Sequence, residues 1–266
     1  MPGRKPRATV NATEVSLGAS LPPLSVEGLP PREAVEQLLP LVEQGRVDAM
    51  HTVAMTMVGC HRARMIRDDD QIRSMLVRRF RWRNGKEPAE DAELDGIARD
   101  LDRLSAERDR CAGLDDSTYM SRLELLEKAA LAGNVDAMLD YADWGLQDMD
   151  GYSAVLRRFD EVARRRVLAL RFLNNALVLG DCRGLPVLAE AYAGIVPRRN
   201  WIVTADPYMA SVYTQAHAQA PALLSDPAHV QSWSNLFDVR SESLDPARRA
   251  AARVQAAQIV QRHCAG

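Results

Sequence analysis

The sequence has few aromatic residues and few residues that favour turns. Aromatic side chains make up 5% of the 266 residues, and there are only 15 glycines and 14 prolines. A β-sandwich or β-barrel needs many turns and strands rich in aromatic residues, so this composition argues against both and favours helices. The sequence also lacks an apolar run of about 18 residues, so we expect no helix that spans a membrane.

An excess of charge of one sign is also missing. Lysine and arginine together number 34 against 36 aspartate and glutamate residues, which leaves a net charge of −2. Such a balance creates no overall field that would attract nucleic acid or an anionic membrane. The remaining composition, 47% hydrophobic and 26% charged residues, is typical of a globular protein with a substantial buried core.

The common motifs of catalysis and metal binding are absent as well. The sequence contains no Gly-x-Ser-x-Gly, no His-Glu-x-x-His, no glycine-rich phosphate loop and no Cys-x-x-Cys. Its histidines are scattered, and none stands beside a serine or carboxylate in a recognisable arrangement. We therefore predict no catalytic residue, no cofactor and no bound metal, although an active site assembled from distant helices would leave no such motif.

Helical periodicity begins near Pro31. Residues 1–30 are rich in proline and lack periodicity, which predicts an extended or disordered arm. The basic residues in this arm are not followed by a continuous apolar stretch, so no intact signal peptide is expected; either the protein stays in the cytoplasm or a leader has been removed. From Pro31 a helical stripe runs to Gly45, and a second helix is expected from about Val47. We take residues 31–266 as a single all-helical repeat domain.

The chain repeats itself. The hexapeptide Gly-Arg-Val-Asp-Ala-Met at residues 45–50 returns 88 residues later as Gly-Asn-Val-Asp-Ala-Met at residues 133–138. A weaker third copy follows after another 47 residues, with Gly180 in the place of Gly133, and a half-copy begins at Ala210. Each unit is predicted as a helix, a glycine turn and a second helix. Because a two-helix hairpin cannot bury its own apolar stripe, such units must stack.

An insertion of about residues 60–116 separates the first two units. It holds two amphipathic segments joined by the polar link 84–88, so we expect a helical hairpin. Residues 78–83, Arg-Arg-Phe-Arg-Trp-Arg, mix cations with aromatic rings as single-strand nucleic-acid binders do. The negative net charge and the acidic residues 68–70 upstream favour a solvated helix face with local ion pairs instead. Two further helices, at about 227–264, are expected to cap the stack.

The second and third units carry a spaced pattern of small, apolar and glycine residues. It runs Leu126-Glu127-Lys128-Ala129-Ala130-x-x-Gly133-x-x-x-Ala137-x-x-x-Tyr141-Ala142, and again Ala169-x-x-Phe172-Leu173-x-x-Ala176-x-x-x-Gly180-x-x-x-Gly184-x-x-x-Leu188-Ala189-x-x-Tyr192. This pattern resembles the Sel1-like repeat family, helical solenoids related to tetratricopeptide repeats. The resemblance implies an all-α fold in which stacked two-helix repeats form a right-handed α/α superhelix, with the helical hairpin as an insertion.

The four cysteines, Cys60, Cys111, Cys182 and Cys264, allow three pairings into two disulfides, or four free thiols. Cys60 and Cys111 flank the insertion, so a bridge between them would fasten its base. Cys182 with Cys264 would then tie the last helix to the third unit. Four reduced cysteines would fit a cytoplasmic protein. Bacterial envelope proteins with Sel1-like repeats often carry such cysteines, and this resemblance implies a periplasmic or secreted protein.

In right-handed helical solenoids the first helices of successive units line a concave groove. By repeat register, the groove-side residues are Glu127, Lys128, Asn174, Asn175, Gln215 and His217, with Trp201 and Tyr208 as anchors on the link after the third unit. We therefore expect a non-enzymatic protein that binds an unknown protein or peptide in the bacterial envelope, as an adaptor or as an inhibitor of immunity type. Nucleic acid, a membrane span and metal are not expected as partners. A periplasmic enzyme such as a β-lactam-binding hydrolase and a cytoplasmic regulatory scaffold are the alternatives.

Overall fold

A computed structural model describes residues 24–264 of the chain, except residues 89, 150, 197–198 and 222–225. Its regular elements in these ranges are all helices, which confirms the all-α prediction. Most of the expected N-terminal arm, residues 1–23, lies outside the described part. Leu24 and Val26, which precede the first helix, pack partly buried against the core. Within the described ranges, no helix combines the length and the apolar character that crossing a bilayer requires.

Three helical hairpins correspond to the three predicted units. Their helices are α1 (Pro31–Glu43) with α2 (Val47–Gly59), α7 (Arg122–Leu131) with α8 (Val135–Trp144), and α10 (Phe159–Val178) with α11 (Gly184–Ala193).

The corners of these hairpins share one backbone conformation. Gly45, Gly133 and Gly180 have φ values of 81°, 97° and 88°, in the left-handed region that glycine adopts without steric cost. At each corner the glycine N–H bonds to the carbonyl three residues before it, and the next N–H bonds to the carbonyl five residues before itself. This pair of bonds is the Schellman motif, which satisfies two carbonyls at the end of the first helix. The sequence repeat therefore encodes a structural repeat at the corner.

The turns after these corners differ in how the second helix starts. In the second hairpin the Asn134 side chain accepts a hydrogen bond of 2.7 Å from the Ala137 N–H, which caps the start of α8. In the third hairpin Asp181, which follows Gly180 as Asn134 follows Gly133, accepts instead from the Arg183 N–H at 3.0 Å. Helix α11 begins four residues after its corner glycine, whereas α8 begins two residues after Gly133. The third corner is therefore longer than the second.

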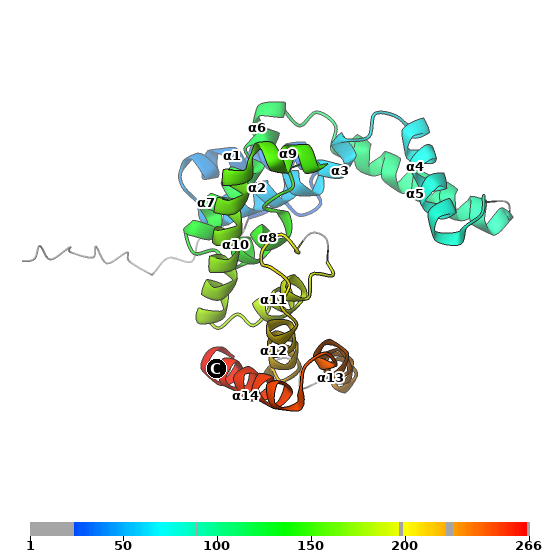
Figure 1. Cartoon of the computed structure of the whole chain (residues 1–266). Helices are drawn as coiled ribbons and strands as arrows, with labels where there is room; N and C mark the ends of the chain where they lie inside the picture. Colours follow the sequence, from blue (N-terminus) through cyan, green and yellow to red (C-terminus); the bar gives the residue numbers. More distant parts are fainter. Residues whose placement is uncertain (1–23, 89, 150, 197–198, 222–225, 265–266) are drawn as a thin grey trace, which may run out of the picture.

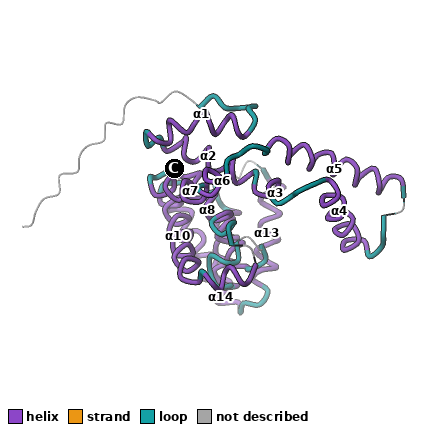
Figure 2. The backbone as a smooth tube through the Cα atoms, turned by 90° about the horizontal axis from the view of Figure 1, so that it is seen from above, coloured by secondary structure: helices purple, strands orange, loops and turns teal. Residues whose placement is uncertain are grey.

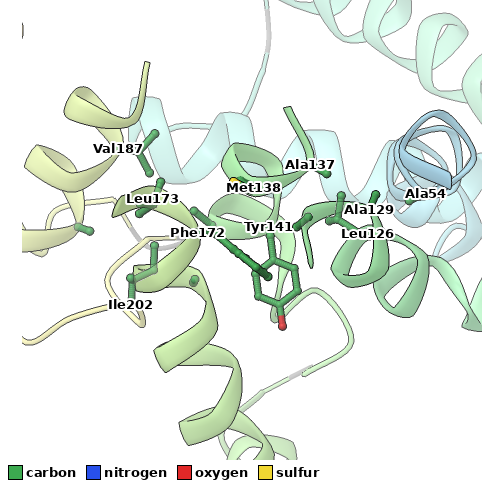
Figure 3. Close-up of a cluster of buried hydrophobic side chains, with 14 of the residues drawn as sticks. Ala54, Leu126, Ala129, Ala137, Met138, Tyr141, Phe172, Leu173, Val187 and Ile202 are labelled. Carbon is green, nitrogen blue, oxygen red and sulfur yellow. The ribbon is translucent and has the colours of Figure 1, made fainter. Parts of the chain in front are cut away.

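The hairpins pack on one another in chain order. Helix α2 lies against α7, α8 against α10, and α11 against α12 (Pro207–Ala218). One cluster of buried residues runs from Val35 in α1 to Cys264 after the last helix. Between the second and third hairpins, the ring of Tyr141 meets Phe172 edge-on, with centroids 5.2 Å apart (Figure 3). Three small residues of the repeated pattern are fully buried: Ala129, Ala137 and Ala142.

The insertion forms a helical arm that projects from the stack (Figures 1 and 2). It contains α3 (His61–Arg64), α4 (Asp69–Asn84) and α5 (Asp91–Arg110), and α4 packs against α5. The side chain of Asp68 caps α4, and Gly85 ends it in the left-handed conformation. At the base of the arm, Cys60 and Cys111 lie at disulfide distance, with Cα atoms 5.6 Å apart. The predicted hairpin is therefore present, and of the pairings that the sequence left open the structure has Cys60 with Cys111.

The C-terminal helices form the other end of the molecule. Helices α13 (Pro227–Ser241) and α14 (Pro246–His263) both pack on α12. Cys264 lies at disulfide distance from Cys182, with Cα atoms 6.0 Å apart, so the end of α14 is tied to the corner of the third hairpin. Two short helices, α6 (Asp116–Met120) and α9 (Gly151–Arg157), lie in connections before the second and third hairpins.

Candidate binding surface

The first helices of the second and third hairpins, α7 and α10, carry four of the residues predicted to bind a partner. An ion pair joins the two helices, since Glu127 Oε1 lies 2.6 Å from the Arg164 guanidinium. Lys128 is exposed on α7 and pairs with Glu124 at 2.7 Å. Asn174 and Asn175 are both exposed on α10. The structure therefore brings these four predicted residues onto two neighbouring helices.

Glu127 belongs to a network that fixes α7 to α10. The Tyr141 hydroxyl donates to Glu127 at 2.9 Å, and Arg164 donates to both of its carboxylate oxygens. Burial acts to raise the pKa of Glu127, but the hydrogen bonds from Arg164 and Tyr141 outweigh burial and leave it lowered. The same guanidinium, together with that of Arg165, lowers the pKa of Glu161 to about 2. Both carboxylates are therefore ionised at neutral pH, and the role of Glu127 in the structure is to hold helices together.

Helix α10 exposes apolar side chains on the side that faces away from the core. Ala163, Val167, Asn174 and Val178 follow one another at helical spacing, and we call these four residues the α10 face. Val167 is 69% exposed and Val178 is 70% exposed. The sequence analysis missed these valines. Their signal was present in the sequence, because Val167 and Val178 stand at helical spacing from Asn174, which was predicted to face the groove.

A hollow of about 520 Å³ lies beside the α10 face. It is lined by Val167 and Leu170 of α10, by Tyr192 of α11, and by the link that leads to α12. The Arg166 guanidinium donates to the Ile202 carbonyl at 2.9 Å, which holds this link against α10. The arrangement offers an apolar hollow next to exposed amides, which is the type of surface that receives an apolar side chain of a peptide.

The other predicted anchors lie apart from the α10 face. Trp201 is half-buried, packs against the main core and approaches Gly145. Tyr208 is also half-buried, and its hydroxyl donates to Gln255 Oε1 on α14 at 2.9 Å. Gln215 is half-buried on α12. Both aromatic side chains are therefore engaged in contacts within the molecule. Tyr208 was predicted on the link after the third unit, but it lies in the first turn of α12.

His217 is buried in a second cavity, of about 620 Å³, near the Cys182–Cys264 pair. Its Nε2 lies 3.4 Å from Nε2 of His229, and its ring packs edge-on against Trp233. Burial, and then the neighbouring His229, lower the pKa of His217 to about 4, so this imidazole is neutral at pH 7. His217, predicted on the groove side, is therefore an interior residue, and no sequence pattern pointed to its ring neighbours His229 and Trp233.

The described residues offer little catalytic chemistry. Among them, no group of three histidine, cysteine or acidic side chains is arranged to hold a metal ion. His51 on α2 and Asp140 on α8 meet at 2.8 Å. No hydroxyl or thiol in the described part of the chain hydrogen-bonds to His51, so the pair resembles a contact between hairpins more than an activated nucleophile.

Comparisons of the chain with protein-family models, with curated proteins and with solved structures find no match.

Proposed function

We propose that the chain is a non-enzymatic helical-repeat protein that binds another protein or peptide through the α10 face, as an adaptor or inhibitor in an oxidising compartment such as the bacterial periplasm. The observation that carries this proposal is the exposed apolar stripe of α10 beside a hollow. Val167 lines that hollow, and both Val167 and Val178 are more than two-thirds exposed. Apolar patches of this kind on soluble proteins often mark interaction sites.

The repeat pattern supports the same proposal. We propose that the hairpins are Sel1-like repeats stacked in a right-handed superhelix. The shared conformation of the corners at Gly45, Gly133 and Gly180 supports this assignment, as does the packing of the hairpins in chain order. In such superhelices the first helices line the binding side, and α7 and α10 are first helices.

The cysteine pairs support the compartment. All four cysteines lie in two pairs at disulfide distance. Disulfides persist in the periplasm and outside the cell, whereas the cytoplasm keeps thiols reduced. Thiol titration of the denatured protein from its natural source should find no free thiol without reductant and four after reduction. Four free thiols before reduction would favour the cytoplasmic scaffold.

Site-specific photo-crosslinking in the natural cells tests the binding surface. A photoreactive amino acid at residue 167 or 178 should give the same discrete adduct with a second protein. The matched control is residue 254 on α14, where Val254 is 59% exposed on a different helix. Adducts that are absent at 167 and 178, or identical to those at 254, would contradict the proposal.

The captured protein must then bind the purified chain directly. Burial of one valine side chain stabilises a complex by about 1.5–3 kcal/mol, so Val167→Asp should weaken binding at least about tenfold in calorimetry. Val254→Asp should leave the affinity unchanged. Equal effects of the two substitutions would place the binding surface elsewhere.

A further inference from the structure

The arm formed by α4 and α5, which projects from the stack (Figures 1 and 2), carries a group of cations at the end of α4. Arg78, Arg79 and Arg83 are exposed there, and Trp82 is 84% exposed. Arg81 has an ion-pair partner, but the other three arginines have none among the residues that the structure describes. We call Arg78, Arg79, Trp82 and Arg83 the α4 cluster. Its three cations therefore stand without a counter-charge.

The members of the α4 cluster are neighbours on the surface of the helix. Arg83 follows Arg79 by four residues and Trp82 follows it by three, and side chains at these spacings lie next to each other. Like charges four residues apart oppose helix formation, so an anion bound to both arginines would remove a repulsion that the free arm contains. Tryptophan and arginine are also the residue types that most often dominate binding energy at protein interfaces.

A hollow of about 500 Å³ lies between the two helices of the arm, beside the α4 cluster. Arg79 and Arg83 line it from α4, together with apolar side chains of both helices. Among these apolar side chains, Leu76 is buried, and Phe80 and Ile97 are half-buried. The hollow therefore combines two exposed cations with an apolar lining.

The acidic side chains that line this hollow already have cationic partners. Glu93 lies 2.9 Å from Lys86 Nζ, and Asp100 lies 3.1 Å from the guanidinium of Arg103. Neither carboxylate forms an ion pair with the two arginines that line the hollow from α4. The unpaired charges of the hollow are therefore positive, which makes it complementary to a ligand that brings carboxylates and an apolar group.

We propose that the arm docks an acidic segment of another protein at this hollow. An aliphatic side chain of the segment enters the hollow, and its flanking carboxylates bind Arg79 and Arg83, because a guanidinium matches a carboxylate with two parallel hydrogen bonds. Trp82 covers the apolar part of the segment from the side. The proposal does not rest on the α10 face, which lies on the stack rather than on the arm.

Nucleic acid and anionic lipid also carry negative charge, but the arm suits them less well. The α4 cluster spans six residues of helix, which is a length of about 9 Å. Proteins that bind a single strand track several nucleotides along a longer cationic groove. The start of α5, level with the cluster, exposes Asp91 and Asp95, which would repel a chain of phosphates. These features favour a ligand with a few carboxylates over a polyphosphate.

Fluorescence anisotropy with short labelled peptides tests the proposal on the full-length protein. The amidated peptide Glu-Glu-Leu-Glu-Glu should bind with a dissociation constant of about 0.1 mM at low salt. Binding should weaken at least about tenfold at about 0.5 M salt, and by a similar factor for Gln-Gln-Leu-Gln-Gln. Glu-Glu-Ala-Glu-Glu should also bind at least about tenfold more weakly, because alanine leaves the apolar hollow unfilled.

Three results of these titrations would overturn the proposal. They are no binding of the acidic peptide at about 1 mM protein, equal binding of the glutamine peptide, and equal binding of the alanine peptide. An oligothymidylate or phosphatidylglycerol vesicles that bind the protein more tightly than the acidic peptide at the same salt would assign the α4 cluster to phosphates, and would overturn it as well.

Charge reversal in the hollow provides the decisive variant. Arg79→Glu with Arg83→Glu should lose the acidic peptide and bind Lys-Lys-Leu-Lys-Lys instead. The matched control, Arg157→Glu with Arg262→Glu, changes the net charge equally at exposed residues of α9 and α14. It should bind the acidic peptide as the wild type does and should not bind the lysine peptide. Equal binding of the lysine peptide by both double variants would contradict a site in the hollow.

Trp82→Ala keeps the proposal testable if the reversed charges disturb the arm. Because Trp82 is exposed, its removal should leave the helix content in circular dichroism unchanged. The affinity for the acidic peptide should fall at least about threefold, since the indole ring no longer covers the bound segment. An unchanged affinity would show that the segment does not reach the α4 cluster.

Discussion

Replacement of the corner glycine Gly133 by alanine should destabilise the stack. The φ of 97° at this residue lies in the left-handed region, which costs an alanine about 1–2 kcal/mol. An added Cβ would meet no atom within 4 Å, so packing adds no further penalty. Alanine also restricts the unfolded chain, which stabilises the folded state relative to it by about 0.4–1 kcal/mol. The first effect is larger, and the net expectation is a loss of about 1 kcal/mol in the free energy of unfolding.

Gly59, in the last turn of α2, provides the matched control. It has helical backbone, and an added Cβ there also meets nothing within 4 Å. Alanine at this position should stabilise the protein by about 0.5–1 kcal/mol. In urea unfolding followed by circular dichroism, the midpoint should fall by about 0.3 M for Gly133→Ala and rise by a similar amount for Gly59→Ala, given a slope of about 3 kcal/mol per M. If Gly133→Ala raised the midpoint, the left-handed corner and the repeat built on it would be wrong.

Three further predictions concern other parts of the molecule. Replacement of both Cys60 and Cys111 by alanine should lower the free energy of unfolding by up to about 4 kcal/mol, because the bridge closes a 51-residue loop. A loss under about 1 kcal/mol in denaturant titration would show that the bridge does not constrain the unfolded chain. His217 has a pKa of about 4 in the folded protein against an ordinary 6.5, so between these pH values only the unfolded chain binds its proton, and the free energy of unfolding should fall by up to about 3 kcal/mol from pH 6.5 to pH 4. If His217→Phe left the pH dependence of the free energy of unfolding unchanged, this expectation would be wrong. Tyr141→Phe should cost about 1–2 kcal/mol by removing a donor to Glu127, and an equal loss in the Glu127→Gln background would show that the two residues are not coupled.

Local features of the fold were predictable from the sequence because their signals are local. The corners at Gly45 and Gly133 stand in repeated hexapeptides, and a glycine after a helix commonly adopts the left-handed conformation that ends the helix. The hairpin arm was predictable from two amphipathic segments and a polar link. The sequence left the cysteine pairing open, and the structure selects the pairing in which Cys60 and Cys111 join the two ends of that hairpin.

The candidate binding surface was only partly predictable, because it depends on which helix faces stay uncovered. Repeat register placed Asn174 and Asn175 on the groove side of a first helix, and both are exposed on α10. Repeat register alone could not show that Val167, two helical turns before Asn174 on α10, has no helix packed over it. Nor could it show that Tyr208 and His217 would be covered by the C-terminal helices. These outcomes depend on how α13 and α14 fold back on α12, and no sequence period describes that contact.

The Cys60–Cys111 pair at the base of the arm allows the arm to be exchanged without rearrangement of the stack. The chain leaves the stack at Cys60 and returns at Cys111, and the two Cα atoms are only 5.6 Å apart. Because α2 packs directly on α7, the stack closes across this point as though a tight turn connected the two helices. Arms of different length or sequence could therefore be grafted between these cysteines while the hairpins keep their order. Natural selection could therefore change the binding properties of the arm without altering the packing of the hairpins in the stack.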